Sequence, residues 1–134
     1  MNEYVQQAKD FLESCNATME IKYAGLEVPN WDNKKHAMYH FLIETPKGEM
    51  GVLFYASLVD TQKGKFPTEY DVLSCLSTYE VGDLEDFMFE FGYEIKKRGD
   101  LKRIQDTYNA VVREYQDVCR CFTEEQIETL NEIV

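Results

Sequence analysis

The chain has 134 residues, 44% of them hydrophobic, and its 25 acidic and 14 basic side chains leave a net charge of −11. This hydrophobic content is sufficient for one packed core and excludes a disordered chain, so we expect a single domain over residues 1–134. The negative charge excludes direct binding of nucleic acid or of an anionic membrane surface, because both normally require a basic face.

The first predicted element is a helix from Glu3 to Ser14. Asn2 is placed to cap its start, and Asn16 can close it in the left-handed conformation. Apolar side chains at helical spacing form one stripe along it, which consists of Val5, Ala8, Leu12 and Cys15.

Three segments with strand-like patterns follow, at about 17–24, 36–45 and 50–59. The first places Met19, Ile21 and Tyr23 on one face, as in a half-buried strand. The second does the same with Ala37, Tyr39, Phe41 and Ile43. The third is apolar on both faces, which favours a central or covered strand. Together they predict a three-stranded antiparallel sheet.

Four helices are predicted after the sheet, at about 69–77, 83–92, 101–121 and from 124 onward. Thr68 and Thr123 are placed to cap the first and last of them, and Gly92 to end the second. The third has the longest apolar stripe, formed by Leu101, Ile104, Tyr108, Val111, Val112, Tyr115, Val118, Cys119 and Phe122. We therefore expect an α+β fold in which an N-terminal helix and four C-terminal helices pack on the sheet.

One segment stands out for its charge. Between residues 69 and 94 there are eight acidic side chains and no Lys or Arg: Glu69, Asp71, Glu80, Asp83, Glu85, Asp86, Glu90 and Glu94. Residues 67–134 hold sixteen acids and seven bases, whereas residues 1–66 hold nine and seven. The segment is also aromatic, and on a helix Leu84, Phe87, Met88 and Phe91 would form a stripe apart from the carboxylates.

Two interpretations of this segment are open. It can be the solvated face of an ordinary amphipathic helix, or a recognition surface that presents carboxylates to a basic partner. A helix face that serves stability alone usually places bases three or four residues from its acids, because such pairs stabilise the helix. No base stands at this spacing within the segment, which favours recognition. Trp31, the only Trp, lies in a polar turn and either packs on the sheet or anchors a partner. The basic run after the segment, at 96–103, is expected to pair with nearby acids.

The sequence offers little for catalysis. His36 and His40 would share one strand face, with Tyr39 between them, which leaves a small enzyme or ligand-binding protein as the alternative class. A third metal ligand is not evident, and Cys119-Arg-Cys121 lacks the spacing of a zinc or redox site. We therefore expect no catalytic residue, no metal and no cofactor. Without a signal peptide or an apolar run of membrane-spanning length, we expect a cytoplasmic protein with reduced thiols.

Two stretches of the C-terminal half, FPTEYDVLSCLSTYEVGDLEDFMFEFGYE and YNAVVREYQDVCRCFTEEQIETLNEI, resemble a family of small proteins from phages, prophages and mobile elements of gut-associated bacteria. The resemblance covers about residues 66–134 and carries over no functional residues. It implies an anti-CRISPR protein, an inhibitor of the type II RNA-guided nuclease. Such nucleases hold nucleic acid in basic channels, which a compact acidic protein could occupy. The hypothesis is thus a binding inhibitor of a host defence or nucleic-acid-handling protein.

Overall fold

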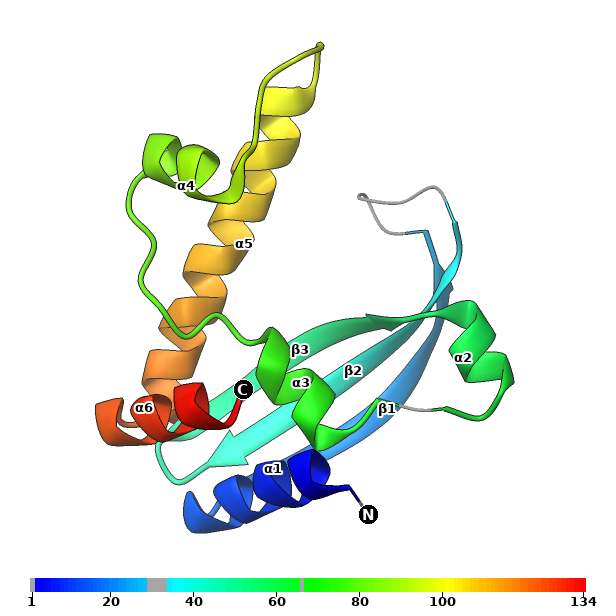
Figure 1. Cartoon of the computed structure of the whole chain (residues 1–134), viewed down its shortest axis with the longest axis vertical. Helices are drawn as coiled ribbons and strands as arrows, with labels where there is room; N and C mark the ends of the chain where they lie inside the picture. The colour runs from blue at the N-terminus through cyan, green and yellow to red at the C-terminus, as the bar shows by residue number, and fades with distance from the viewer. Residues whose placement is uncertain (1, 29–33, 66) are drawn as a thin grey trace.

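The computed structural model describes residues 2–28, 34–65 and 67–134. It confirms the α+β class, with an N-terminal helix, an antiparallel sheet and then helices (Figure 1). In chain order the elements are α1 (Glu3–Ser14), β1 (Thr18–Glu27), β2 (His36–Thr45), β3 (Gly48–Ala56), α2 (Leu58–Gln62), α3 (Glu69–Cys75), α4 (Leu84–Phe91), α5 (Asp100–Cys121) and α6 (Glu124–Ile133).

The sheet has the order β1-β2-β3 with antiparallel neighbours. Phe41 of β2 lies opposite Ile21 of β1 and Val52 of β3, which sets the register. The predicted face of β2 is buried throughout, at Ala37, Tyr39, Phe41 and Ile43. The prediction for residues 50–59 was wrong, because β3 is an edge strand that alternates between buried and exposed side chains. That segment also ends earlier than predicted, since Ser57 caps the additional helix α2.

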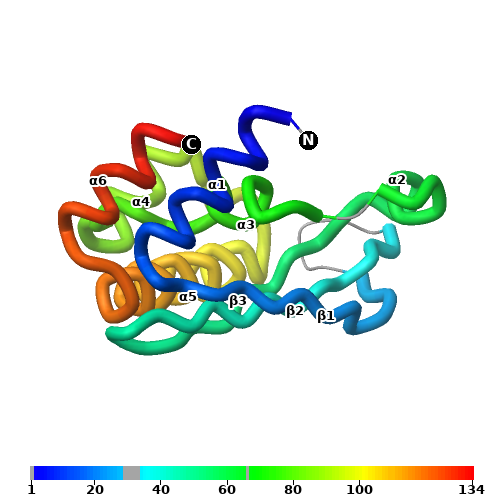
Figure 2. Tube along the Cα trace, turned by 90° about the horizontal axis from the view of Figure 1, so that it is seen from below, coloured from blue at the N-terminus to red at the C-terminus, as the bar shows by residue number. Residues whose placement is uncertain are grey.

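Three helices cover one face of the sheet and close the main core. Figure 2 shows α1 and α6 on the same side of the three strands, with α3 beside them. Each begins at the predicted cap: the side chains of Asn2, Thr68 and Thr123 accept hydrogen bonds from backbone N–H groups in the first turn. Their buried side chains include Ala8, Phe11, Leu12, Val72, Leu73 and Leu130, which meet the sheet in one cluster.

Helix α5 departs from the predicted pattern. With 22 residues it is about 33 Å long at 1.5 Å per residue, and its first half extends beyond the sheet (Figure 1). Of its predicted stripe, Ile104, Val118 and the following Phe122 are buried, whereas Leu101 is 49% exposed. Cys119 is exposed too, and Cys121 takes the core position instead. Helix α4 packs against the projecting half of α5. None of the described helices is both long and apolar enough to cross a membrane.

Candidate binding surface on helix α4

Helix α4 is defined by signals at both of its ends. The Asp83 side chain accepts a hydrogen bond from the backbone N–H of Asp86 at 2.9 Å, and Gly92 ends the helix with a left-handed φ of 72°. The predicted acidic stripe therefore divides. Asp83 is the cap, while Glu94 lies beyond the helix, 3.5 Å from the amino group of Lys96.

An aromatic cluster holds α4 on α5, separate from the main core. The Phe87 side chain is 2% exposed, and its ring centroid lies 4.9 Å from that of Phe91, 5.4 Å from that of Tyr93 and 5.3 Å from that of Tyr108. Tyr108 comes from α5, and its hydroxyl donates to the carbonyl oxygen of Gly82, at 2.7 Å. Ring packing and this hydrogen bond together fix the position of a helix of only 8 residues.

The opposite face of α4 is open to solvent. Residues at i, i+1, i+4 and i+5 share one side of a helix, which here brings together Glu85, Asp86, Phe89 and Glu90. Phe89 is 91% exposed, and the three carboxylate residues around it are exposed as well. We call these four residues the α4 surface. The three acids were predicted from the sequence, but Phe89 was not. Its helical spacing from the acids could have shown that it shares their face.

A groove of about 580 Å³ runs beside the α4 surface. Residues of segment 76–81 and of α4, α5 and α6 line it, among them Tyr79, Glu80, Glu90 and Phe91. Hydrogen bonds from this segment reach two other helices. The Ser77 backbone N–H and hydroxyl both donate to the Glu114 carboxylate of α5, and the Thr78 hydroxyl bonds to the Asn131 side chain of α6. Glu80 and Glu90 thus add negative charge to a mostly apolar groove.

The remaining predicted site residues do not join this surface. Glu69 and Asp71 belong to α3, which packs against α1 beside the sheet, away from α4 (Figure 1). Both are half-buried, and the Asp71 carboxylate accepts from the backbone N–H of Thr68 at 2.9 Å as part of a capping box. Their role there is helix capping and dipole compensation. Trp31 lies outside the described residues.

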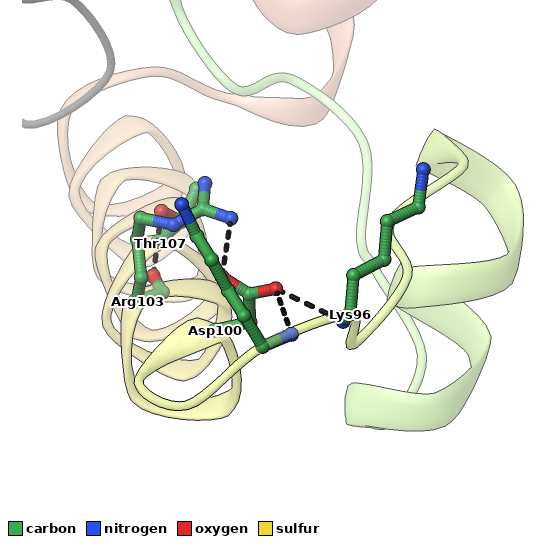
Figure 3. A network of polar contacts seen from close by, with 5 residues as sticks. Lys96, Asp100, Arg103 and Thr107 are labelled. Carbon is green, nitrogen blue, oxygen red and sulfur yellow. Dashed lines mark hydrogen bonds and ion pairs between the residues drawn. The ribbon is translucent and has the colours of Figure 1, made fainter.

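The basic run beyond Glu94 is held by a buried carboxylate, Asp100. The side chain accepts from the backbone N–H groups of Lys96 at 2.9 Å and Lys97 at 3.0 Å, and from the Arg103 guanidinium at 3.4 Å (Figure 3). These bonds, led by the one from Lys96, hold the pKa of Asp100 below its usual value. Asp100 thus fixes the backbone of Lys96 and Lys97 at the start of α5.

The histidines of the sheet give a poor active site. His36 and His40 share a face of β2, but Tyr39 lies on the other face, in the core. Cys15 and Cys121 are also in that core, so the sheet separates them from the exposed His40. Burial raises the pKa of both thiols, which disfavours the reactive thiolate. Within the described ranges, no three His, Cys, Asp or Glu side chains are grouped so that they could hold a metal ion.

Comparison with known proteins adds no relative to this picture: no family model, no curated protein and no solved structure matches the chain.

Proposed function

We propose that this protein acts by binding another protein, and that the α4 surface is its contact. The observation that carries the proposal is Phe89, which is 91% exposed on a helix whose opposite face is held on α5 by the buried Phe87. An aromatic side chain in water lowers solubility and contributes nothing to the fold. At an interface, the same side chain is the kind of residue that supplies most of the binding energy.

The three carboxylates around Phe89 define the chemistry of the partner. A guanidinium group can pair with a carboxylate through two hydrogen bonds and stack on an aromatic ring at the same time. An arginine-rich protein surface with apolar side chains between the charges fits this arrangement best. Because α4 is already ordered by Phe87 and Tyr108, binding would cost little conformational entropy.

Arginine-rich surfaces are typical of proteins that hold nucleic acid. The proposed role is therefore that of a small protein of a phage or mobile element that inhibits a defence or nucleic-acid-handling protein in the cytoplasm of its bacterial host. The type II RNA-guided nuclease is the first partner to test, since its basic channel would accept an acidic helix in place of phosphates. The charge of α4 and the family resemblance of residues 66–134 both support this choice.

The test compares two triple variants with the same change in net charge. Glu85→Gln, Asp86→Asn and Glu90→Gln remove the acids of the α4 surface. Glu125→Gln, Glu128→Gln and Glu132→Gln remove three exposed acids of α6 and serve as the matched control. Binding of each to the guide-loaded nuclease is measured by surface plasmon resonance at 50 and 300 mM salt.

We expect the α4 variant to bind at least tenfold more weakly at low salt, mostly through a slower association rate, and the control to match the parent. The affinity of the parent should fall as salt rises. Equal binding by both variants would reject the α4 surface. If the parent does not bind the nuclease, the same pair of variants is compared in capture from a bacterial lysate, and equal recovery of every captured protein would reject the proposed function.

A further inference from the structure

Strand β1 is a long edge strand with apolar side chains in the open. It runs for 10 residues and, among the residues that the structure describes, pairs only with β2. Ile21 is 43% exposed, Tyr23 53% and Leu26 50%. An edge of this kind presents unpaired backbone N–H and C=O groups beside apolar side chains, which is a template for pairing with another strand.

The core of the protein is open at this edge. Ile21 lies opposite Phe41, which is 1% exposed, and Tyr23 lies opposite Tyr39, which is 3% exposed. The rings of Tyr23 and Tyr39 are 5.5 Å apart. On the core face of the sheet, exposed side chains of β1 thus lie next to buried side chains of β2. Helix α1 leaves most of β1 uncovered. One further strand on this edge would cover the side chains that remain exposed.

The sequence of β1 is complementary to itself. When a second copy is set antiparallel with Ile21 opposite Ile21, Glu20 of each copy faces Lys22 of the other, and Met19 of each faces Tyr23 of the other. The opposite charges then meet on the solvent face, and the apolar side chains meet on the core face. All of these positions precede the irregularity in the ladder between Tyr23 and Gly25, where the regular strand is interrupted.

Other registers lose this complementarity. The core faces of the two copies form one continuous face only if the two-fold axis passes through a residue. If the axis lay between two residues, core-facing side chains of one strand would stand opposite solvent-facing side chains of the other. An axis at Glu20 or at Lys22 sets that charge opposite its own copy. An axis at Met19 or Tyr23 leaves Glu20 and Lys22 without an oppositely charged cross-strand neighbour. Only the axis at Ile21 pairs both charges.

We propose that the protein forms a two-fold symmetric homodimer in which two β1 strands pair antiparallel about Ile21 and create a continuous six-stranded sheet. This arrangement is independent of helix α4, which lies beyond β3 on the side of the sheet away from β1 (Figure 1). The dimer would carry two α4 surfaces at opposite ends, so a partner with repeated basic sites would be bound bivalently.

The test is a charge exchange followed by sedimentation equilibrium between 1 and 200 μM. The parent is expected at twice the monomer mass of 15.7 kDa. Lys22→Glu sets Glu20 against a second Glu, and Glu20→Lys sets Lys22 against a second Lys, so each single variant should sediment as a monomer. An equimolar mixture of the two should restore the dimer, because both cross-strand pairs are then opposite in charge. The double variant with both changes should also dimerise.

The control is Lys63→Glu, at the exposed C-cap of α2, which changes the net charge by the same amount as Lys22→Glu and should leave the dimer intact. Circular dichroism verifies that each variant is folded. A parent that is monomeric over the whole range would overturn the proposal and leave the edge to a strand of another protein. A dimer that survives both single changes would overturn it as well, since the interface would then lie elsewhere.

Discussion

The hydroxyl of Tyr108 donates a hydrogen bond to the carbonyl oxygen of Gly82, at 2.7 Å, although 26 residues separate the two in the chain. Tyr108 lies in the projecting half of α5, and Gly82 directly precedes the Asp83 cap of α4. The bond therefore anchors the start of α4 on α5. Since the ring of Tyr108 also meets that of Phe87, one side chain of α5 holds both the start and the packed face of α4.

Tyr108→Phe should loosen α4 without unfolding the protein. The change removes the donor to Gly82 and keeps the ring, and a typical intramolecular hydrogen bond contributes about 0.5–1.5 kcal/mol. We expect a loss of that size in urea denaturation and faster hydrogen exchange in α4, with unchanged exchange in β2. Tyr79→Phe, at a tyrosine that is 70% exposed, is the control and should change neither measurement. Unaltered exchange in α4 would mean that the bond does not position the helix.

Phe87 and Phe89 should behave in opposite ways. Phe87→Ala removes the centre of the aromatic cluster, and truncations of buried Phe typically cost about 3–5 kcal/mol. Phe89→Ala changes an exposed side chain and should stay within about 0.5 kcal/mol of the parent in urea denaturation. In the binding assay, however, Phe89→Ala should lose at least tenfold in affinity. A stable Phe89→Ala protein that binds like the parent would remove Phe89 from the interface.

Asp100→Asn should destabilise the protein in a pH-dependent manner. The pKa of Asp100 is lowered in the folded state, so the carboxylate favours folding above the ordinary Asp pKa of about 4 and loses this effect as the pH falls through the lower folded value. We expect Asp100→Asn to melt several degrees below the parent at pH 7, and the gap to narrow below pH 4. Asp106→Asn, at an exposed carboxylate of the same helix that pairs with Lys102, should show a much smaller gap. A gap of equal size at pH 7 and pH 3 would contradict the role of the charge.

The four thiols should divide into two classes. Cys15 and Cys121 are 4% and 1% exposed, whereas Cys75 and Cys119 are exposed. Burial raises the pKa of Cys75 as well as that of Cys15 and Cys121, so access to the sulfur makes the difference. At pH 8, iodoacetamide should modify Cys75 and Cys119 in the folded protein and the other two only after denaturation, as read by peptide mass spectrometry. The melting midpoint should not change with reductant or with a chelator. Rapid native labelling of Cys121 would place it outside the core.

Features that depend on a few neighbouring residues could be predicted from the sequence. The caps at Asn2, Thr68 and Thr123 and the helix end at Gly92 are local, because a side chain or a backbone conformation meets groups within four residues. The two-residue periods of the strands are local too, and they led to the correct antiparallel sheet. The acids of α4 were found for the same reason, since composition and helical period are read directly from the chain.

Exposure was decided only by the tertiary structure. The stripe of α5 is regular, yet Leu101 is half exposed because the helix extends beyond the sheet. At the other end of α5, Cys119 was expected in the core but is exposed, and Cys121 is buried there in its place. Periodicity shows which side chains share a face, but not whether another element covers that face. The open edge at β1, the position of β3 and the solvent-facing Phe89 all follow from which elements meet in space, and that depends on contacts between residues far apart in the chain.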